Sequence, residues 1–162
     1  MSMIGMFVQL NNEQFSRALN QPTLLEQLID SAPEDQVLDV DKTWEALYYL
    51  LTGSALADDS GHPLGKVLFS YQYFDEDHDM GYGPAHYLTP EQVKEINTEL
   101  SGVSGLDIRN RYDGAKMDEA GIYPEVWSDE ESLELVARNF NDLKEFYRTA
   151  AERSYAMVMY IE

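Results

Sequence analysis

"SYAMVMYIE", residues 154–162, is the stretch that decides the fold. Its apolar side chains fall on both sides of an extended chain, because Tyr155, Met157, Met159 and Ile161 alternate with Ala156, Val158 and Tyr160. A strand that is apolar on both faces is typical of the middle of a sheet, so this stretch predicts a central strand. "MIGMFVQL", residues 3–10, is also short, apolar and rich in strand formers, and it predicts a second buried strand.

Capping patterns predict helices between these two strands. Thr89 is expected to be the N-cap of a helix in which Gln92 completes a capping box. Ser128 and Glu131 repeat this pattern and are expected to begin the longest helix. Apolar residues then recur at steps of three and four over residues 133–150, as a helix buried on one side requires.

A further helix is predicted in "LDVDKTWEALYYLLTG", residues 38–53. Asp41 is expected to cap its N-terminus, and Gly53 to end it in the left-handed conformation. Its core-facing side chains, spaced for one face of a helix, are Trp44, Leu47, Tyr48 and Leu51.

Together these segments predict the fold class. About six helices and a few strands, with no regular alternation of strand and helix, argue against a Rossmann fold. We expect an α+β fold, a mainly helical single domain over residues 1–162. Its small, largely antiparallel sheet should include the N- and C-terminal strands and carry helices on one face. A length of 162 residues fits one domain of the usual 100–200 or so.

The composition excludes several classes of function. The formal net charge is -19, which repels nucleic acids and anionic membrane surfaces and attracts a basic protein partner. Solubility alone is the other explanation of this charge. The absence of cysteine excludes disulfides, zinc–thiolate sites and cysteine nucleophiles. No signal-peptide pattern or membrane-length apolar run is present, so we expect a cytoplasmic protein.

Motifs for metals and cofactors are incomplete. Asp75, Asp77 and Asp79 have the first three spacings of a calcium loop, but Met80 and His86 stand where glycine and glutamate are needed. The histidines do not form a zinc-binding pair, and no phosphate-binding loop or nucleophile elbow is present. We therefore predict no metal, no cofactor and no assigned catalytic residue, while cation binding by the Asp75–Asp79 loop stays open.

Aromatic residues beside acidic ones indicate a binding surface. Tyrosine and tryptophan are favoured at protein interfaces because they bury a large area and keep a polar end. Ordinary half-buried packing is the alternative. The residues predicted to contact a partner are Tyr49, Tyr73, Asp75, Asp77, Asp79, Tyr82, Tyr123 and Trp127.

Three stretches, "MIGMF", "LDVDKTWEALYYLLTG" and "GIYPEVW", together resemble the YfbM-like family of bacterial domains of unknown function. The resemblance runs in order from Met3 to about Tyr160, but the acidic, tyrosine-rich region Tyr71–Tyr87 departs from it. It implies an α+β domain and supplies no catalytic residues. It also implies an association of some relatives with immunity against bacterial toxins.

We therefore expect a non-enzymatic protein-binding module, of the kind represented by immunity-type inhibitors of a basic toxin or another basic partner. The rival hypothesis is an enzyme with an acid/base site around Asp39, Asp41, Tyr48 and a histidine. A structural or oligomeric module is a third reading.

Overall fold

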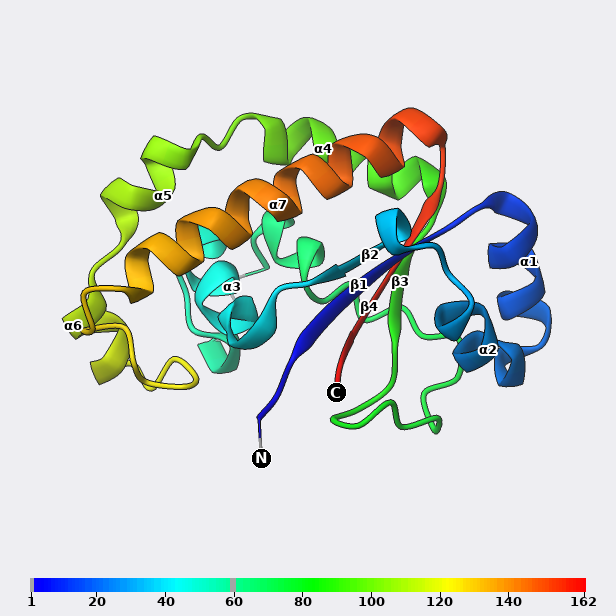
Figure 1. Cartoon of the computed structure of the whole chain (residues 1–162), viewed down its shortest axis with the longest axis horizontal. Helices are drawn as coiled ribbons and strands as arrows, with labels where there is room; N and C mark the ends of the chain where they lie inside the picture. The colour runs from blue at the N-terminus through cyan, green and yellow to red at the C-terminus, as the bar shows by residue number, and fades with distance from the viewer. Residues whose placement is uncertain (1, 59–60) are drawn as a thin grey trace.

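A four-stranded antiparallel sheet lies at the centre of the computed structural model, which describes residues 2–58 and 61–162. Its strands are β1 (Gly5–Leu10), β2 (Val37–Asp39), β3 (His86–Leu88) and β4 (Ala156–Ile161). They are arranged in the order β2-β1-β4-β3 (Figure 1). This confirms the predicted α+β class, the sheet that includes both terminal strands and the central place of the C-terminal one.

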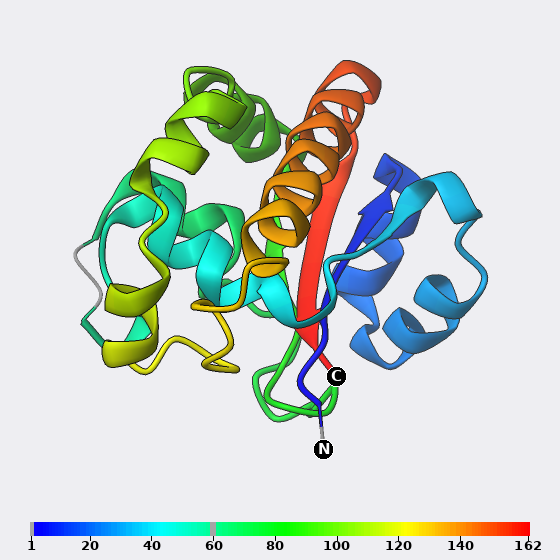
Figure 2. The ribbon, with the colours of Figure 1, turned by 60° about the vertical axis from the view of Figure 1, so that its left-hand side comes forward.

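β1 and β4 are paired along their full length. Gly5 lies opposite Ile161 and Leu10 opposite Ala156, and just beyond them Ile4 and Glu162 exchange two backbone hydrogen bonds of 2.9 and 3.0 Å. The edge strands β2 and β3 contain three residues each, and the sequence pattern did not indicate β2. The two termini therefore emerge side by side, as both ribbon views show (Figures 1 and 2).

Helices cover both faces of the sheet, which corrects the expectation of one covered face. Phe7, Met157 and Met159 point into the larger core, and Val8, Val158 and Tyr160 into the smaller one. The larger core contains α3 (Trp44–Thr52), α4 (Pro90–Ser101), α5 (Gly105–Arg111), α6 (Gly114–Glu119) and α7 (Ser132–Arg153). The smaller core lies under α1 (Asn12–Asn20) and α2 (Leu25–Asp30), seen at the right of Figure 2. β4 has apolar side chains on both of its faces, so a second layer of helices is needed to bury the face opposite the larger core.

α3 has the predicted core face and end but a different start. Trp44 is buried, and Gly53 ends the helix with φ of 78°. Asp41 does not cap it: the helix begins at Trp44 after a 3-10 turn over Asp41–Thr43, and Asp41 itself has φ of 52°. Asp39 explains the difference, because its Oδ1 accepts the Asp41 N–H at 2.7 Å and sets up a local turn before the helix.

The two predicted capping boxes have opposite outcomes. Thr89 caps α4, and Gln92 completes the box as expected. Ser128 does not begin α7, which starts at Ser132 without a side-chain cap. Instead both the hydroxyl and the N–H of Ser128 donate to Asp118, at 2.6 and 3.0 Å. The Asp118 carboxylate, ten residues earlier in the chain, therefore binds the side chain that was expected to cap α7.

The segment before α7 is a set of turns. The Tyr123–Pro124 peptide bond is cis, and Glu125 has φ of 65°. No helix among the described residues is long and apolar enough to cross a lipid bilayer.

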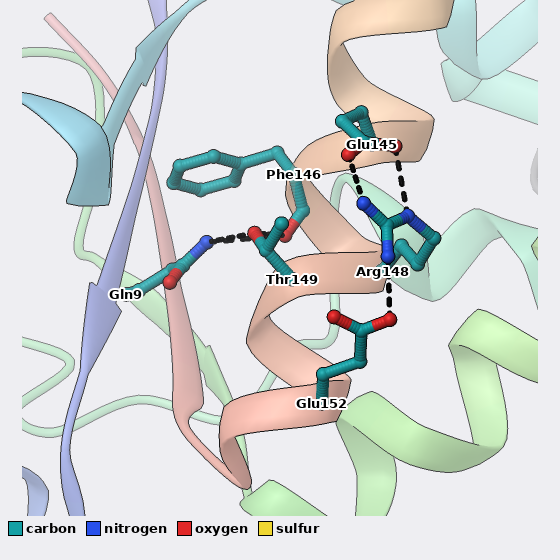
Figure 3. A network of polar contacts seen from close by, with 6 residues as sticks. All are labelled: Gln9, Glu145, Phe146, Arg148, Thr149 and Glu152. Atoms are coloured by element: carbon teal, nitrogen blue, oxygen red, sulfur yellow. Dashed lines mark hydrogen bonds and ion pairs between the residues drawn. The ribbon is translucent and has the colours of Figure 1, made fainter.

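Polar contacts fix the C-terminal half of α7 to β1. The Gln9 amide is fully buried and donates to the Phe146 carbonyl at 3.1 Å and to the Thr149 hydroxyl at 2.9 Å (Figure 3). On the outer side of the same helix, Arg148 forms ion pairs with Glu145 and Glu152 (Figure 3).

Candidate functional site

A chain of ring contacts runs across the molecule near the N-terminal end of β1. Trp44 stacks on Tyr123 with ring centroids 5.8 Å apart and meets Phe69 edge-on at 6.0 Å. The His86 ring lies 5.4 Å from Phe69 and 4.7 Å from Tyr73. We call this chain the aromatic strip; its members are Tyr123, Trp44, Phe69, His86, Tyr71 and Tyr73.

The strip reaches the surface at tyrosines. Tyr71 lies 5.4 Å from His86, ring to ring, and is 54% exposed. Tyr82, which lines the same cavity as His86, is 44% exposed. Since most large apolar side chains in this molecule are buried, two exposed tyrosines around one histidine mark this surface as a candidate for binding.

His86 is the polar centre of the strip. Its residue is 8% exposed, and burial lowers its pKa from 6.5 to about 4, so the ring is neutral near pH 7. Nδ1 accepts the Tyr71 N–H at 2.9 Å, which leaves the proton on Nε2. No residue in the described part of the chain forms a hydrogen bond with Nε2.

A small cavity of about 30 Å³ lies beside this histidine. Its wall includes Gly5, Trp44, Tyr82 and Ile161, so it lies where β1 begins and β4 ends. No motif in the sequence marks His86 as the centre of a site, because its aromatic surroundings come from separate parts of the chain.

The carboxylates of the Asp75–Asp79 loop organise their own turns. Asp75 accepts the Asp77 N–H at 3.0 Å, and Asp79 accepts the N–H groups of Gly81 and Gly83 at 2.7 and 3.1 Å. These backbone donors hold the pKa of Asp79 below its usual value. Among the described residues, no three histidine or carboxylate side chains are grouped closely enough to hold a metal ion. The loop thus presents fixed negative charge next to Tyr73 and Tyr82.

The remaining predicted contact residues lie elsewhere. Trp127 was wrongly assigned to the surface: it is 2% exposed, and its Nε1 donates to the Ile122 carbonyl at 2.8 Å. Tyr49 is half-buried against the larger core. Tyr123 is also half-buried, and its hydroxyl accepts the Met3 N–H at 2.9 Å.

The residues of the rival acid/base hypothesis do not converge. Asp41 lines a hollow with Tyr123, whereas Tyr48 lines another with His62 and Lys66. Asp39 is exposed and uses one oxygen to hold the backbone of Asp41. This arrangement offers no shared pocket in which the carboxylates and Tyr48 could act on one substrate.

Comparisons with known proteins identify the fold and family. The chain is 26% identical over 137 residues to Protein YfbM of Escherichia coli strain K12, covering 81% of this chain and 78% of that protein. It is also similar to the crystal structure of YfbM, a protein of unknown function from Escherichia coli. That match has a TM-score of 0.77 at 21% identity and covers 98% of this chain and 99% of the other. The model of the domain of unknown function DUF1877 matches residues 1–160. This protein therefore belongs to the DUF1877 family of YfbM-like proteins.

Proposed function

We propose that this protein binds a basic protein partner without transforming it, through the exposed end of the aromatic strip and the adjoining Asp75–Asp79 loop. The observation that supports this most directly is the pairing of exposed Tyr71 and Tyr82 with a fixed acidic loop. Tyrosine rings supply contact area with few rotatable bonds, and arginine or lysine side chains stack on them.

The overall charge supports the same class of partner. A net charge of -19 attracts a basic surface over several ångströms and accelerates the encounter. A nucleic acid or an anionic membrane would be repelled by the same field. We place this interaction in the cytoplasm, a reducing compartment that suits a chain without cysteine.

An immunity-type inhibitor is the specific form of this function that we propose. Toxins that act on nucleic acids need basic active sites, and an acidic surface with aromatic anchors would cover such a site. The protein would then act by occlusion, which requires a fixed surface and no chemistry of its own.

The experiment begins with capture of partners from the native host at low salt, followed by reconstitution with the purified partner. We expect a basic partner whose affinity falls steeply as the NaCl concentration rises. The double variant Tyr71→Ala/Tyr82→Ala should weaken binding by about tenfold or more, since aromatic anchors dominate interfaces.

The matched control is Leu19→Ala/Leu106→Ala, which truncates two apolar side chains that are 41% and 66% exposed on α1 and α5. This control should bind like the wild type. Recovery of no protein partner at low salt, or equal binding by both double variants, would count against the proposal.

A further inference from the structure

A second surface lies at the other end of the aromatic strip, where two hollows meet at Leu135. One has a volume of about 380 Å³ and the other about 390 Å³. We call them together the Leu135 groove. Its apolar wall contains Tyr123, Pro124, Val126 and Leu135, and Val126 is 41% exposed. Tyr123 belongs to both the groove and the strip, and its ring stacks on that of buried Trp44.

The segment that forms the groove is held rigidly. The Ser128 hydroxyl and the N–H groups of Trp127 and Ser128 donate to the Asp118 carboxylate at 2.6, 2.9 and 3.0 Å, and these hydrogen bonds lower the pKa of Asp118. Tyr112 donates its hydroxyl proton to the Trp127 carbonyl at 2.7 Å, and Ser132 donates to the Val126 carbonyl at 2.7 Å. Val126 is therefore exposed on an ordered backbone, and a ligand would meet a preformed apolar wall.

Gly114 allows α6 to pack directly against the segment that forms the groove. A Cβ atom at this position would come within 2.1 Å of the Trp127 carbonyl oxygen, so α6 and the Trp127 backbone are in direct contact. The groove thus depends on close packing between α6 and the segment that precedes α7.

Carboxylates outnumber cations around the groove. Glu134 is already paired with Arg109, at 2.7 Å, and Lys42 and Arg138 are the basic residues of the lining. Other carboxylates on its lining or on the adjoining exposed turn have no ion-pair partner among the described residues; they are Asp41, Glu125, Asp129, Glu130 and Glu131. This balance favours a cationic ligand and disfavours an anionic one.

We propose that the Leu135 groove binds a segment of the partner protein in which an apolar side chain is flanked by arginine or lysine. This inference rests on the proposed function and adds to it the chemistry of one contact. The apolar side chain would pack on Val126 and Leu135, while the flanking cations would face the unpaired carboxylates. A purely basic segment would lack the first contact and a purely apolar one the second.

The test uses the full-length protein and a fluorescein-labelled peptide with the core Arg-Arg-Leu-Arg-Arg, followed by fluorescence anisotropy in 150 mM NaCl. Two control peptides replace the leucine by serine or the arginines by glutamate. We expect the serine peptide to bind about tenfold more weakly, because a buried leucine side chain contributes that much or more. The glutamate peptide should show no binding.

Two variants locate the site. Val126→Ser should remove most of the preference for leucine over serine, and Glu130→Lys should weaken binding of the arginine peptide about fivefold. Glu99→Lys, on α4 and outside the groove, is the matched control for charge. It should change affinity less than twofold, because distant charges are screened beyond about 8 Å at this salt concentration. Circular dichroism melts show whether each variant is folded.

The outcomes separate this inference from the proposed function. Peptide binding that survives both groove variants, or that Glu99→Lys weakens as much as Glu130→Lys, overturns the groove as the site. Absence of peptide binding to the wild type, or equal binding of the leucine and serine peptides, overturns it as well. In each case capture of the host partner and the Tyr71→Ala/Tyr82→Ala variant still decide the proposed function.

Discussion

The two ends of the central sheet treat buried polar groups differently. At one end, the buried Gln9 amide donates to Phe146 and Thr149, and its oxygen accepts from Arg153 at 3.0 Å. At the other end, buried His86 has a partner for Nδ1, but none among the described residues for Nε2, and a small cavity lies beside it.

Charged side chains at the surface also differ between the Gln9 end and the His86 end in whether they have ion-pair partners. Near Gln9, Arg148 pairs with Glu145 and Glu152, and Arg153 pairs with Asp35. Beyond the His86 end, Asp75 and Asp77 have no ion-pair partner among the described residues. Polar groups that have hydrogen-bond or ion-pair partners within the protein stabilise the fold. Polar groups without such partners remain available to a ligand. This contrast is why we place binding at the His86 end.

Acidification should produce the largest effect and should act at the His86 end. Burial lowers the His86 pKa from 6.5 to about 4, so the unfolded chain binds the proton more readily than the folded one. The contribution of neutral His86 to stability is complete above pH 6.5 and is lost as the pH falls towards 4. At about 1.4 kcal/mol per pKa unit, the loss is on the order of 3 kcal/mol.

Urea unfolding at pH 7 and pH 4 measures this loss. The variant His86→Gln should have a smaller pH dependence than the wild type. An unchanged pH dependence in His86→Gln would show that the stability of the fold does not depend on a neutral His86.

Gln9→Leu tests whether the partnered end is structural. The change keeps a similar volume but removes the hydrogen bonds to α7 and the acceptor for Arg153. We expect a loss of about 1–2 kcal/mol in the free energy of unfolding, the usual cost of buried hydrogen bonds. Urea unfolding measures it, and binding of the partner should not change. A loss of binding with normal stability would contradict the division between the two ends.

Arg148→Gln should have the smallest effect. The two ion pairs on the outer side of α7 lie at the surface, where solvent screens them and each contributes little to stability. The loss in the free energy of unfolding should therefore be smaller than that of Gln9→Leu and disappear in 1 M NaCl. A larger loss that persists in high salt would mean that Arg148 stabilises the helix through packing.

Local signals in the sequence were read correctly where the partners are close in the chain. Thr89 caps α4 through Gln92, three residues away, and Gly53 ends α3 through its own backbone conformation. The strand predicted in residues 154–162 is also present, because the positions of apolar side chains along a strand directly reflect which faces are buried.

Signals failed where another residue competed for the same group. Ser128 was expected to cap α7 but donates to Asp118, ten residues away, whereas Asp41 was expected to cap α3 but is held by Asp39, two residues away. Trp127 was expected at the surface, yet its indole donates to Ile122 inside the core. The cluster of Trp44, Phe69 and His86 has no local signature, since only the folded chain brings these rings together.

The pairing of β1 with β4 has a consequence for biosynthesis. Residues 5–10 cannot pair with β4 until residues 156–161 have left the ribosome, so the middle of the sheet closes only after those residues have been made. Until then the nascent chain exposes apolar strands without partners, a state that invites aggregation. We therefore expect ribosome-stalled chains that end before residue 156 to depend on chaperones for their solubility.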